Sequence, residues 1–154
     1  MLGGGIVPGS LVLLSGEPGI GKSTIIIETA DKIAKSVGKV LYVSGEESEQ
    51  QVKIRADRVC GQISDSLYIY PETCIDSVLA VCEELKPSFL VIDSIQTMFT
   101  SEVDSVAGSV TQIRACSNLL MKLCKANNIP AFIVAHVTKS GDLAGQKTIE
   151  HMVE

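Results

Sequence analysis

Eight consecutive residues near the start of the chain have the types and spacing of a phosphate-binding loop. Residues 16–23 read Gly-Glu-Pro-Gly-Ile-Gly-Lys-Ser, which matches G-x-x-x-x-G-K-[ST] at every fixed position. Glycines let backbone N–H groups surround phosphate oxygens without interference from Cβ atoms. We expect Lys22 to reach the β- and γ-phosphates of ATP and the Ser23 hydroxyl to bind Mg²⁺. The predicted nucleotide-binding residues are Gly16, Glu17, Pro18, Gly19, Ile20, Gly21, Lys22, Ser23 and Thr24.

The residues on both sides of this loop favour the same interpretation. The apolar run 11–15 predicts a strand before the loop, and a helical pattern starts near Lys22. A helix that begins there directs the positive end of its dipole at the bound anion. The alternative is an ordinary glycine-rich turn, which requires neither the flanking elements nor the fixed positions.

A carboxylate at another predicted strand end suits the same chemistry. Asp93 follows the apolar run Phe89-Leu-Val-Ile92, which is the Walker B pattern. In that pattern the carboxylate holds the hydration shell of Mg²⁺. Asp is also a common strand terminator, so the prediction depends on the phosphate loop upstream.

Two adjacent acids, Glu46 and Glu47, follow the apolar run 40–43. Hydrolysis of ATP needs a carboxylate that orients and polarises the attacking water. We predict that one of the pair is catalytic and favour Glu46. Both would otherwise be first-turn acids, which are favourable at the N-terminus of the next helix.

His136 follows the apolar run 131–134, where a polar side chain would touch the γ-phosphate or serve only a structural role. Lys139 and Lys147 flank the glycine-containing loop 140–145. Such lysines would track the phosphate backbone of DNA, or lie on a solvated turn. The segment 97–109 carries two acids and no base before Arg114, so its charge disfavours DNA binding.

Composition limits the remaining possibilities. The chain has 154 residues, enough for one domain with a core, and 45% of them are hydrophobic but only 4% aromatic. Its net charge of −5 excludes an overall basic surface for nucleic acid. Its five cysteines lack C-x-x-C spacing, so we expect no zinc site. Because their number is odd and the sequence shows no signal peptide, we expect the thiols to be reduced in the cytoplasm. No apolar run is long enough to span a membrane. The cysteines predicted to lie in the core are Cys82, Cys116 and Cys124.

The pattern of apolar runs predicts an α/β fold with a parallel sheet. Strands are expected at 11–15, 40–43, 67–70, 89–92 and 131–134, and helices at about 22–36, 48–59, 75–86 and 108–127. Strands without polar alternation, separated by helices, indicate a sheet covered on both faces. Ligands of such sheets bind beyond the carboxyl ends of the strands, where the phosphate loop falls.

At the level of whole segments, the chain resembles the bacterial RadA (Sms) DNA-repair ATPases. The resemblance covers essentially the whole length, in order and with compatible spacing. The phosphate loop alone indicates only an NTPase, whereas Gly-Glu-Glu-Ser and His-Val-Thr-Lys are more specific. The segments that carry it are 2–10, 16–23, 42–48, 91–96, 135–139 and 143–153.

The resemblance implies a P-loop NTPase with a RecA-like core that assembles into hexameric rings. Family members use ATP and Mg²⁺ to drive branch migration of recombination intermediates along single-stranded DNA, and they act with a recombinase protein. Glu46 would be the water-activating carboxylate, and His136 would sense the γ-phosphate. The loops 97–109 and 138–147 would face DNA in the ring channel.

The chain also departs from the family pattern. The family has an N-terminal four-cysteine zinc finger, a Lys-Asn-Arg-Phe-Gly segment and a protease-like C-terminal domain, none of which this sequence contains. Gln146 stands where proline is usual, which alters the second loop. We therefore expect residues 1–154 to be a truncated ATPase core that binds nucleotide but hydrolyses it slowly.

Two other functions fit parts of the pattern. A clock-type or signalling ATPase of the RecA-like superfamily also fits the paired glutamates, and its output is protein binding rather than DNA movement. A small-molecule kinase shares the loop and sheet but needs a lid bearing arginines. Stimulation by single-stranded DNA separates the DNA motor from the signalling ATPase. The arginines of the chain are Arg55, Arg58 and Arg114.

Overall fold

A single parallel sheet of five strands forms the centre of the computed structural model, which describes residues 9–16 and 20–136. The strand order is β1-β5-β4-β2-β3, so the last strand in sequence lies between the first and the fourth. This confirms the predicted α/β fold with a parallel sheet. The strands are β1 Leu11–Gly16, β2 Val40–Ser44, β3 Leu67–Pro71, β4 Phe89–Asp93 and β5 Ala131–His136.

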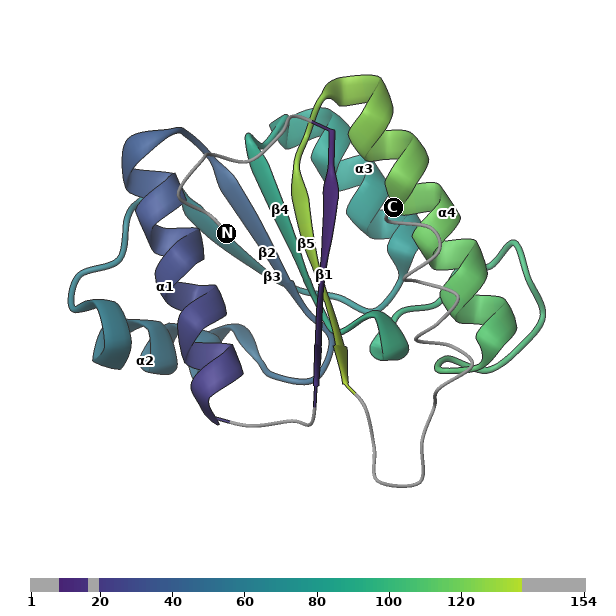
Figure 1. Ribbon diagram of the computed structural model, residues 1–154, viewed down its shortest axis with the longest axis horizontal. Helices are drawn as coiled ribbons and strands as arrows, with labels where there is room; N and C mark the ends of the chain where they lie inside the picture. The colour runs from purple at the N-terminus through teal and green to yellow at the C-terminus, as the bar shows by residue number, and fades with distance from the viewer. Residues whose placement is uncertain (1–8, 17–19, 137–154) are drawn as a thin grey trace.

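Helices cover both faces of the sheet (Figure 1). One pair lies on one face and the other pair on the opposite face, as expected for parallel strands joined by crossover helices. No helix within residues 9–16 and 20–136 is long and apolar enough to cross a membrane. The first pair is α1 Ile20–Ser36 and α2 Glu49–Cys60; the second is α3 Ile75–Leu85 and α4 Val110–Asn127; a 3₁₀ turn, η1, spans Ile95–Thr97.

Alternation along the strands divides the core into two layers. Successive strand side chains point to opposite faces, so Val40 and Tyr42 pack under α1 and α2, while Leu41 and Val43 pack under α3 and α4. All five residues of β2 are buried, which explains its continuous apolar character. Full burial of each large aliphatic side chain contributes about 1.5–3 kcal/mol, so these layers supply most of the stabilisation of the fold.

The three cysteines predicted to be core residues are buried in the layer under α3 and α4. Burial raises the pKa of Cys82, Cys116 and Cys124 to about 12, so the thiols stay protonated at neutral pH. A protonated, buried thiol behaves as a small apolar side chain.

A capping box fixes where α2 begins. The Ser48 hydroxyl accepts a hydrogen bond from the Gln51 backbone N–H at 3.2 Å, and the Ser48 N–H donates to the Gln51 side chain at 2.9 Å. The helix therefore starts a few residues beyond β2. Glu46 and Glu47 are confined to the short connection between the two elements.

Strand register brings the predicted site residues to one edge of the sheet. Ser44 lies opposite Asp93 across β2 and β4, and Asp93 lies opposite Val134 across β4 and β5. Gly16, the last residue of β1, lies opposite His136. The carboxyl ends of four strands thus meet where the phosphate loop leaves β1.

Two polar side chains hold the connection between η1 and α4, within the segment 97–109. The Asp76 carboxylate accepts hydrogen bonds from the Thr100 hydroxyl at 3.0 Å and the Ser101 N–H at 3.1 Å. The buried Gln112 amide accepts from the Thr100 N–H at 2.9 Å and donates to the Ser105 carbonyl at 2.8 Å. Hydrogen bonds with Asp76 on α3 and Gln112 on α4 therefore hold residues 100–105 of this connection in place.

Asp76→Asn is expected to destabilise the protein by about 1 kcal/mol at pH 7 and by less at pH 3. The pKa of Asp76 is lowered, chiefly by the hydrogen bond from the Ser101 backbone. A lowered carboxyl pKa contributes stability above its ordinary value, near 3.8, and that stability disappears as the pH falls through the native value. Urea unfolding at both pH values measures the difference. An equal effect at pH 3 and pH 7 would contradict a role for the charge.

Candidate nucleotide-binding site

Asp93 and His136 lie side by side at the carboxyl edge of the sheet. The His136 Nε2 is 3.5 Å from the Asp93 Oδ1, and the two side chains are 21% and 13% exposed. Alternation explains the meeting, because Val91 and Val134, two residues earlier in each strand, both belong to the layer under α1 and α2. Asp93 and His136 therefore face the side of the sheet that carries α1, the helix that follows the phosphate loop.

Only part of the phosphate loop lies within the described structure. The backbone of β1 ends at Gly16 and α1 begins at Ile20, two residues earlier than expected. Residues 17–19 and the side chains of Lys22 and Ser23 are outside the described part, as are Lys139 and Lys147. The residues on either side of this gap are described, because β1 ends at Gly16, which is paired with His136, and α1 begins at Ile20. In the sheet, β5 lies between β1 and β4, the strand that carries Asp93.

A chain of three further side chains leads to Asp93. The buried Tyr42 hydroxyl donates to the Asp93 Oδ2 at 2.9 Å. The Arg55 Nη2 donates to the Tyr42 hydroxyl at 3.3 Å and to the Glu47 Oε1 at 2.8 Å. Neither the phosphate-loop motif nor the Walker B pattern predicted a role for Tyr42 or Arg55. The available signal was a tyrosine in an otherwise aliphatic strand, at a position that shares a face with Asp93.

The surroundings of Tyr42 and Arg55 keep both side chains protonated, so that each remains a hydrogen-bond donor. Burial, and then the Asp93 charge, raise the pKa of Tyr42 above its ordinary value, so the hydroxyl remains a donor. Burial acts to lower the pKa of Arg55, but Tyr42, Glu47 and Asp93 outweigh it and the net shift is upward. The guanidinium therefore stays charged.

The two glutamates have different surroundings. Glu47 accepts from Arg55, and its backbone N–H donates to the Ser44 hydroxyl at 3.1 Å. Glu46 is exposed, and among the described residues its carboxylate makes no hydrogen bond or ion pair. The Glu47 carboxylate is thus paired with Arg55, whereas the Glu46 carboxylate is free to contact a ligand.

Gly45 permits the close approach of this segment to η1. Its N–H donates to the Asp93 carbonyl at 2.9 Å, which continues the pairing of β2 with β4 beyond the strand end. A Cβ atom at this position would collide with the Thr97 side chain, which is itself hydrogen-bonded to the Ser94 carbonyl. Glycine is therefore required by space rather than by its backbone angles.

Gln96 fastens the end of β5. Its side-chain amide donates to the His136 carbonyl at 2.9 Å and accepts from the His136 N–H at 3.2 Å. Pairing of β4 with β5 ends at Asp93 and Val134, so the amide takes over where the strand pairing stops. This pair of hydrogen bonds joins the backbone of His136 to η1, which follows Asp93 along the chain.

The donors and acceptors present suit a hydrated Mg²⁺ ion and an anion. Within residues 9–16 and 20–136, no cluster of three or more histidine, cysteine or acidic side chains could hold a metal alone. Mg²⁺ normally keeps several waters and takes only one or two carboxylates together with substrate phosphates, which matches Asp93. Several residues near Asp93 also have buried polar atoms without a protein partner. These atoms are the Ser94 Oγ, the His136 Nδ1 and two nitrogens of Arg55. Such atoms are usually satisfied by ligand or water.

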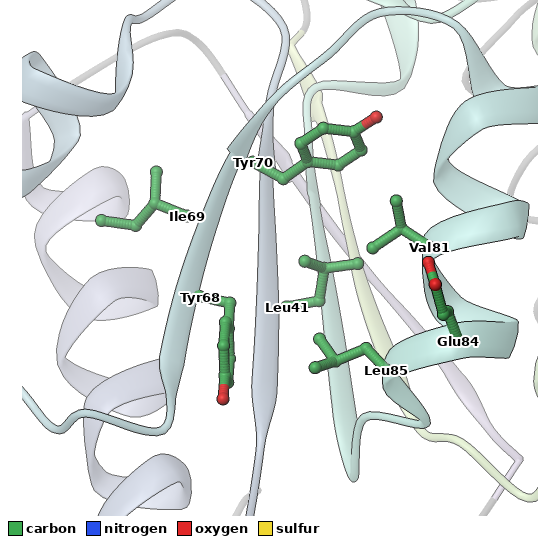
Figure 2. A pocket seen from close by; sticks show the side chains of 7 residues that line it. All are labelled: Leu41, Tyr68, Ile69, Tyr70, Val81, Glu84 and Leu85. Atoms are coloured by element: carbon green, nitrogen blue, oxygen red, sulfur yellow. The ribbon is translucent and has the colours of Figure 1, made fainter.

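A groove elsewhere on the sheet is separate from this site. It has a volume of about 360 Å³ and lies between β3 and α3 (Figure 2). Because β3 and β1 are opposite edges of the sheet, the groove is remote from the phosphate loop. Its lining residues are Leu41, Tyr68, Ile69, Tyr70, Val81, Glu84 and Leu85.

Together, the strand-loop-helix motif, the Walker B carboxylate two strands away and the parallel sheet define a RecA-like P-loop ATPase domain. The chain belongs to the AAA domain family, whose model matches residues 1–142.

The resemblance to RadA is also confirmed by curated relatives, each named DNA repair protein RadA. The proteins from Streptococcus pneumoniae, Listeria monocytogenes and Bacillus subtilis are 54%, 52% and 49% identical to this chain. Each match covers 100% of the chain but only 36%, 34% and 33% of the relative. The chain therefore spans about a third of the length of these relatives.

Solved structures with low sequence similarity share the fold. One solved ATPase domain has a TM-score of 0.76 at 14% identity, and the match covers 94% of this chain and 66% of that one. A DnaB-like replicative helicase, solved in a study of its interactions with primase, has a TM-score of 0.72 at 14% identity, covering 88% and 41%. At this identity the likeness establishes the RecA-like fold and no more.

Proposed function

We propose that the chain is the ATP-binding and ATP-hydrolysing core of a DNA-repair motor that drives branch migration on single-stranded DNA. The observation that carries the proposal is the meeting of Asp93 and His136 beside the end of β1, where the phosphate loop begins. The names of the relatives, all DNA repair proteins, direct the proposed output to DNA.

Each predicted site residue has a role in this proposal. The backbone of residues 16–24 and the Lys22 ammonium would bind the phosphates, and Ser23 and Asp93 would hold Mg²⁺. When bound, Mg²⁺ neutralises the negative charge of the phosphates. Glu46 would orient the attacking water, because its carboxylate is exposed and unpaired with Arg55. His136 would contact the γ-phosphate and transmit its presence through β5 to the segment that follows.

The DNA contacts would come from outside the described residues. The net charge is −5, and the acidic residues Glu102 and Asp104 are exposed on the connection before α4. The lysines Lys139 and Lys147 remain the proposed DNA-binding residues. Single-stranded DNA, recombination intermediates, a recombinase and further copies of the chain in a hexameric ring are the proposed partners, and the cytoplasm is the proposed location.

Lys139→Ala is expected to weaken single-stranded DNA binding and to reduce its salt dependence. Loss of one phosphate contact lowers the slope of log affinity against log salt concentration by about 0.7. Fluorescence anisotropy with a labelled oligonucleotide at several salt concentrations measures both quantities. Lys122→Ala, at an exposed position on α4, is the matched control. If the two variants have the same salt slope as the wild type, Lys139 contacts no phosphate.

A signalling ATPase whose output is protein binding is the second candidate. The exposed acids of the connection before α4 favour it, because this surface repels a nucleic-acid backbone. Steady-state ATP hydrolysis with and without single-stranded DNA separates the two, with Lys22→Ala as the blank. Stimulation by DNA supports the motor, whereas hydrolysis that DNA leaves unchanged supports the signalling ATPase.

A further inference from the structure

We propose that Tyr42, Arg55 and Glu47 are positioning residues for Asp93, holding one carboxylate oxygen so that the other serves the Mg²⁺ shell. The inference rests on the proposed function, because it takes the magnesium role of Asp93 as given. It assigns a task to three residues that neither the phosphate-loop motif nor the Walker B motif includes.

The two oxygens of Asp93 are used differently. The Oδ2 accepts from the Tyr42 hydroxyl at 2.9 Å, which is within the normal range for a hydrogen bond from a hydroxyl. The Oδ1 has a longer contact of 3.5 Å with the His136 Nε2. The terminal torsion of an aspartate is broad, so a carboxylate without such a partner would rotate freely. The hydrogen bond from Tyr42 selects one orientation.

Arg55 makes this arrangement directional. A buried tyrosine hydroxyl needs one partner, and Asp93 alone would satisfy it. Arg55 adds a charged donor at 3.3 Å to the same hydroxyl oxygen, although its side chain is only 19% exposed. Because the Tyr42 oxygen accepts a hydrogen bond from Arg55, its own hydrogen is left to point at Asp93. The charged donor also polarises, and so strengthens, the hydrogen bond from Tyr42 to Asp93.

Glu47 completes the chain by fixing the guanidinium. Its Oε1 accepts from the same Arg55 nitrogen at 2.8 Å, and its backbone is tied to Ser44 at the end of β2. These hydrogen bonds therefore link Glu47 in the β2–α2 connection to Arg55 on α2, then to Tyr42 on β2 and finally to Asp93 on β4. They give the adjacent glutamates separate tasks: Glu47 positions Asp93, while the neighbouring Glu46 is left to act on water.

The test measures how much Mg²⁺ each variant needs to bind a fluorescent, non-hydrolysable ATP analogue. Tyr42→Phe keeps the buried ring and removes only the hydroxyl, so the Mg²⁺ concentration at half-maximal binding should rise about tenfold. Tyr70→Phe is the matched control, because its hydroxyl donates to Glu72 on the β3 side of the sheet, away from Asp93. Its Mg²⁺ requirement should equal that of the wild type. Affinity for the analogue without Mg²⁺ should be the same in all three proteins.

Arg55→Lys and Glu47→Gln provide a second arm that does not depend on the folding of Tyr42→Phe. Each should raise the Mg²⁺ requirement about threefold, whereas Arg58→Lys, at an exposed position on the same helix, should not. A wild-type Mg²⁺ requirement in Tyr42→Phe and Arg55→Lys would overturn this inference alone. If the wild type itself binds the analogue without regard to Mg²⁺, the magnesium role of Asp93 in the proposed function fails as well.

Discussion

Lys22→Ala is expected to weaken ATP binding by about 100-fold. The ammonium of this residue is proposed to contact the β- and γ-phosphates, and a charge-assisted hydrogen bond of this kind contributes about 2–3 kcal/mol. The loss should be smaller for ADP, because one of the two contacted phosphates is missing. Titration of a fluorescent nucleotide in the presence of Mg²⁺ measures both affinities.

Lys32→Ala provides the control for Lys22→Ala. Lys32 is an exposed lysine of the same helix, so its removal changes the net charge by the same amount without touching the loop. Its affinity for ATP should match that of the wild type. Equal affinity of Lys22→Ala and Lys32→Ala would reject the assignment of residues 16–23 as a phosphate-binding loop.

Glu46→Gln is expected to slow ATP hydrolysis by about 100-fold or more while ATP binding is retained. General-base catalysis by a positioned carboxylate contributes about 10²–10⁴-fold, and an amide of the same shape cannot accept the proton. Single-turnover hydrolysis by the chain, with binding measured in parallel, separates the two effects. A slower reaction with unchanged affinity identifies an interaction made only in the transition state.

Glu47→Gln is the matched comparison, because it removes the neighbouring charge in the same connection. This variant breaks the ion pair with Arg55, so it should shift the Mg²⁺ requirement more than the rate at saturating Mg²⁺. If Glu47→Gln instead abolishes hydrolysis and Glu46→Gln does not, the assignment of the two residues is reversed.

Much of the architecture follows from local sequence patterns. Apolar runs without alternation predicted all five strands within about two residues of their observed ends. In β2, which is buried at all five positions, the reason is that a strand covered on both faces needs apolar residues along almost its whole length. The phosphate-loop motif likewise required a strand before it and a helix after it. Asp93 and His136 were identified because each closes such a run, and parallel strands place those positions at one edge.

The contacts within the site depended on the tertiary structure. Strand order decides that β5 lies between β1 and β4, and only this order puts His136 next to Asp93. The hydrogen bonds that link Glu47, Arg55, Tyr42 and Asp93 join residues that periodicity does not relate. Tyr42 and Asp93, for example, are 51 positions apart. Gln96 and His136 are 40 apart and meet for the same reason.

The physical reason for this division is the range of the interactions. Hydrophobic periodicity and turn residues report the preferences of a short segment, so the sequence by itself determined the elements, their order and the phosphate-loop motif. Sequence patterns could not show that Glu46 and Glu47, two identical side chains in adjacent positions, have different surroundings. Only the folded chain brought Arg55 against Glu47 and left Glu46 exposed, because that contact depends on how α2 packs over β2.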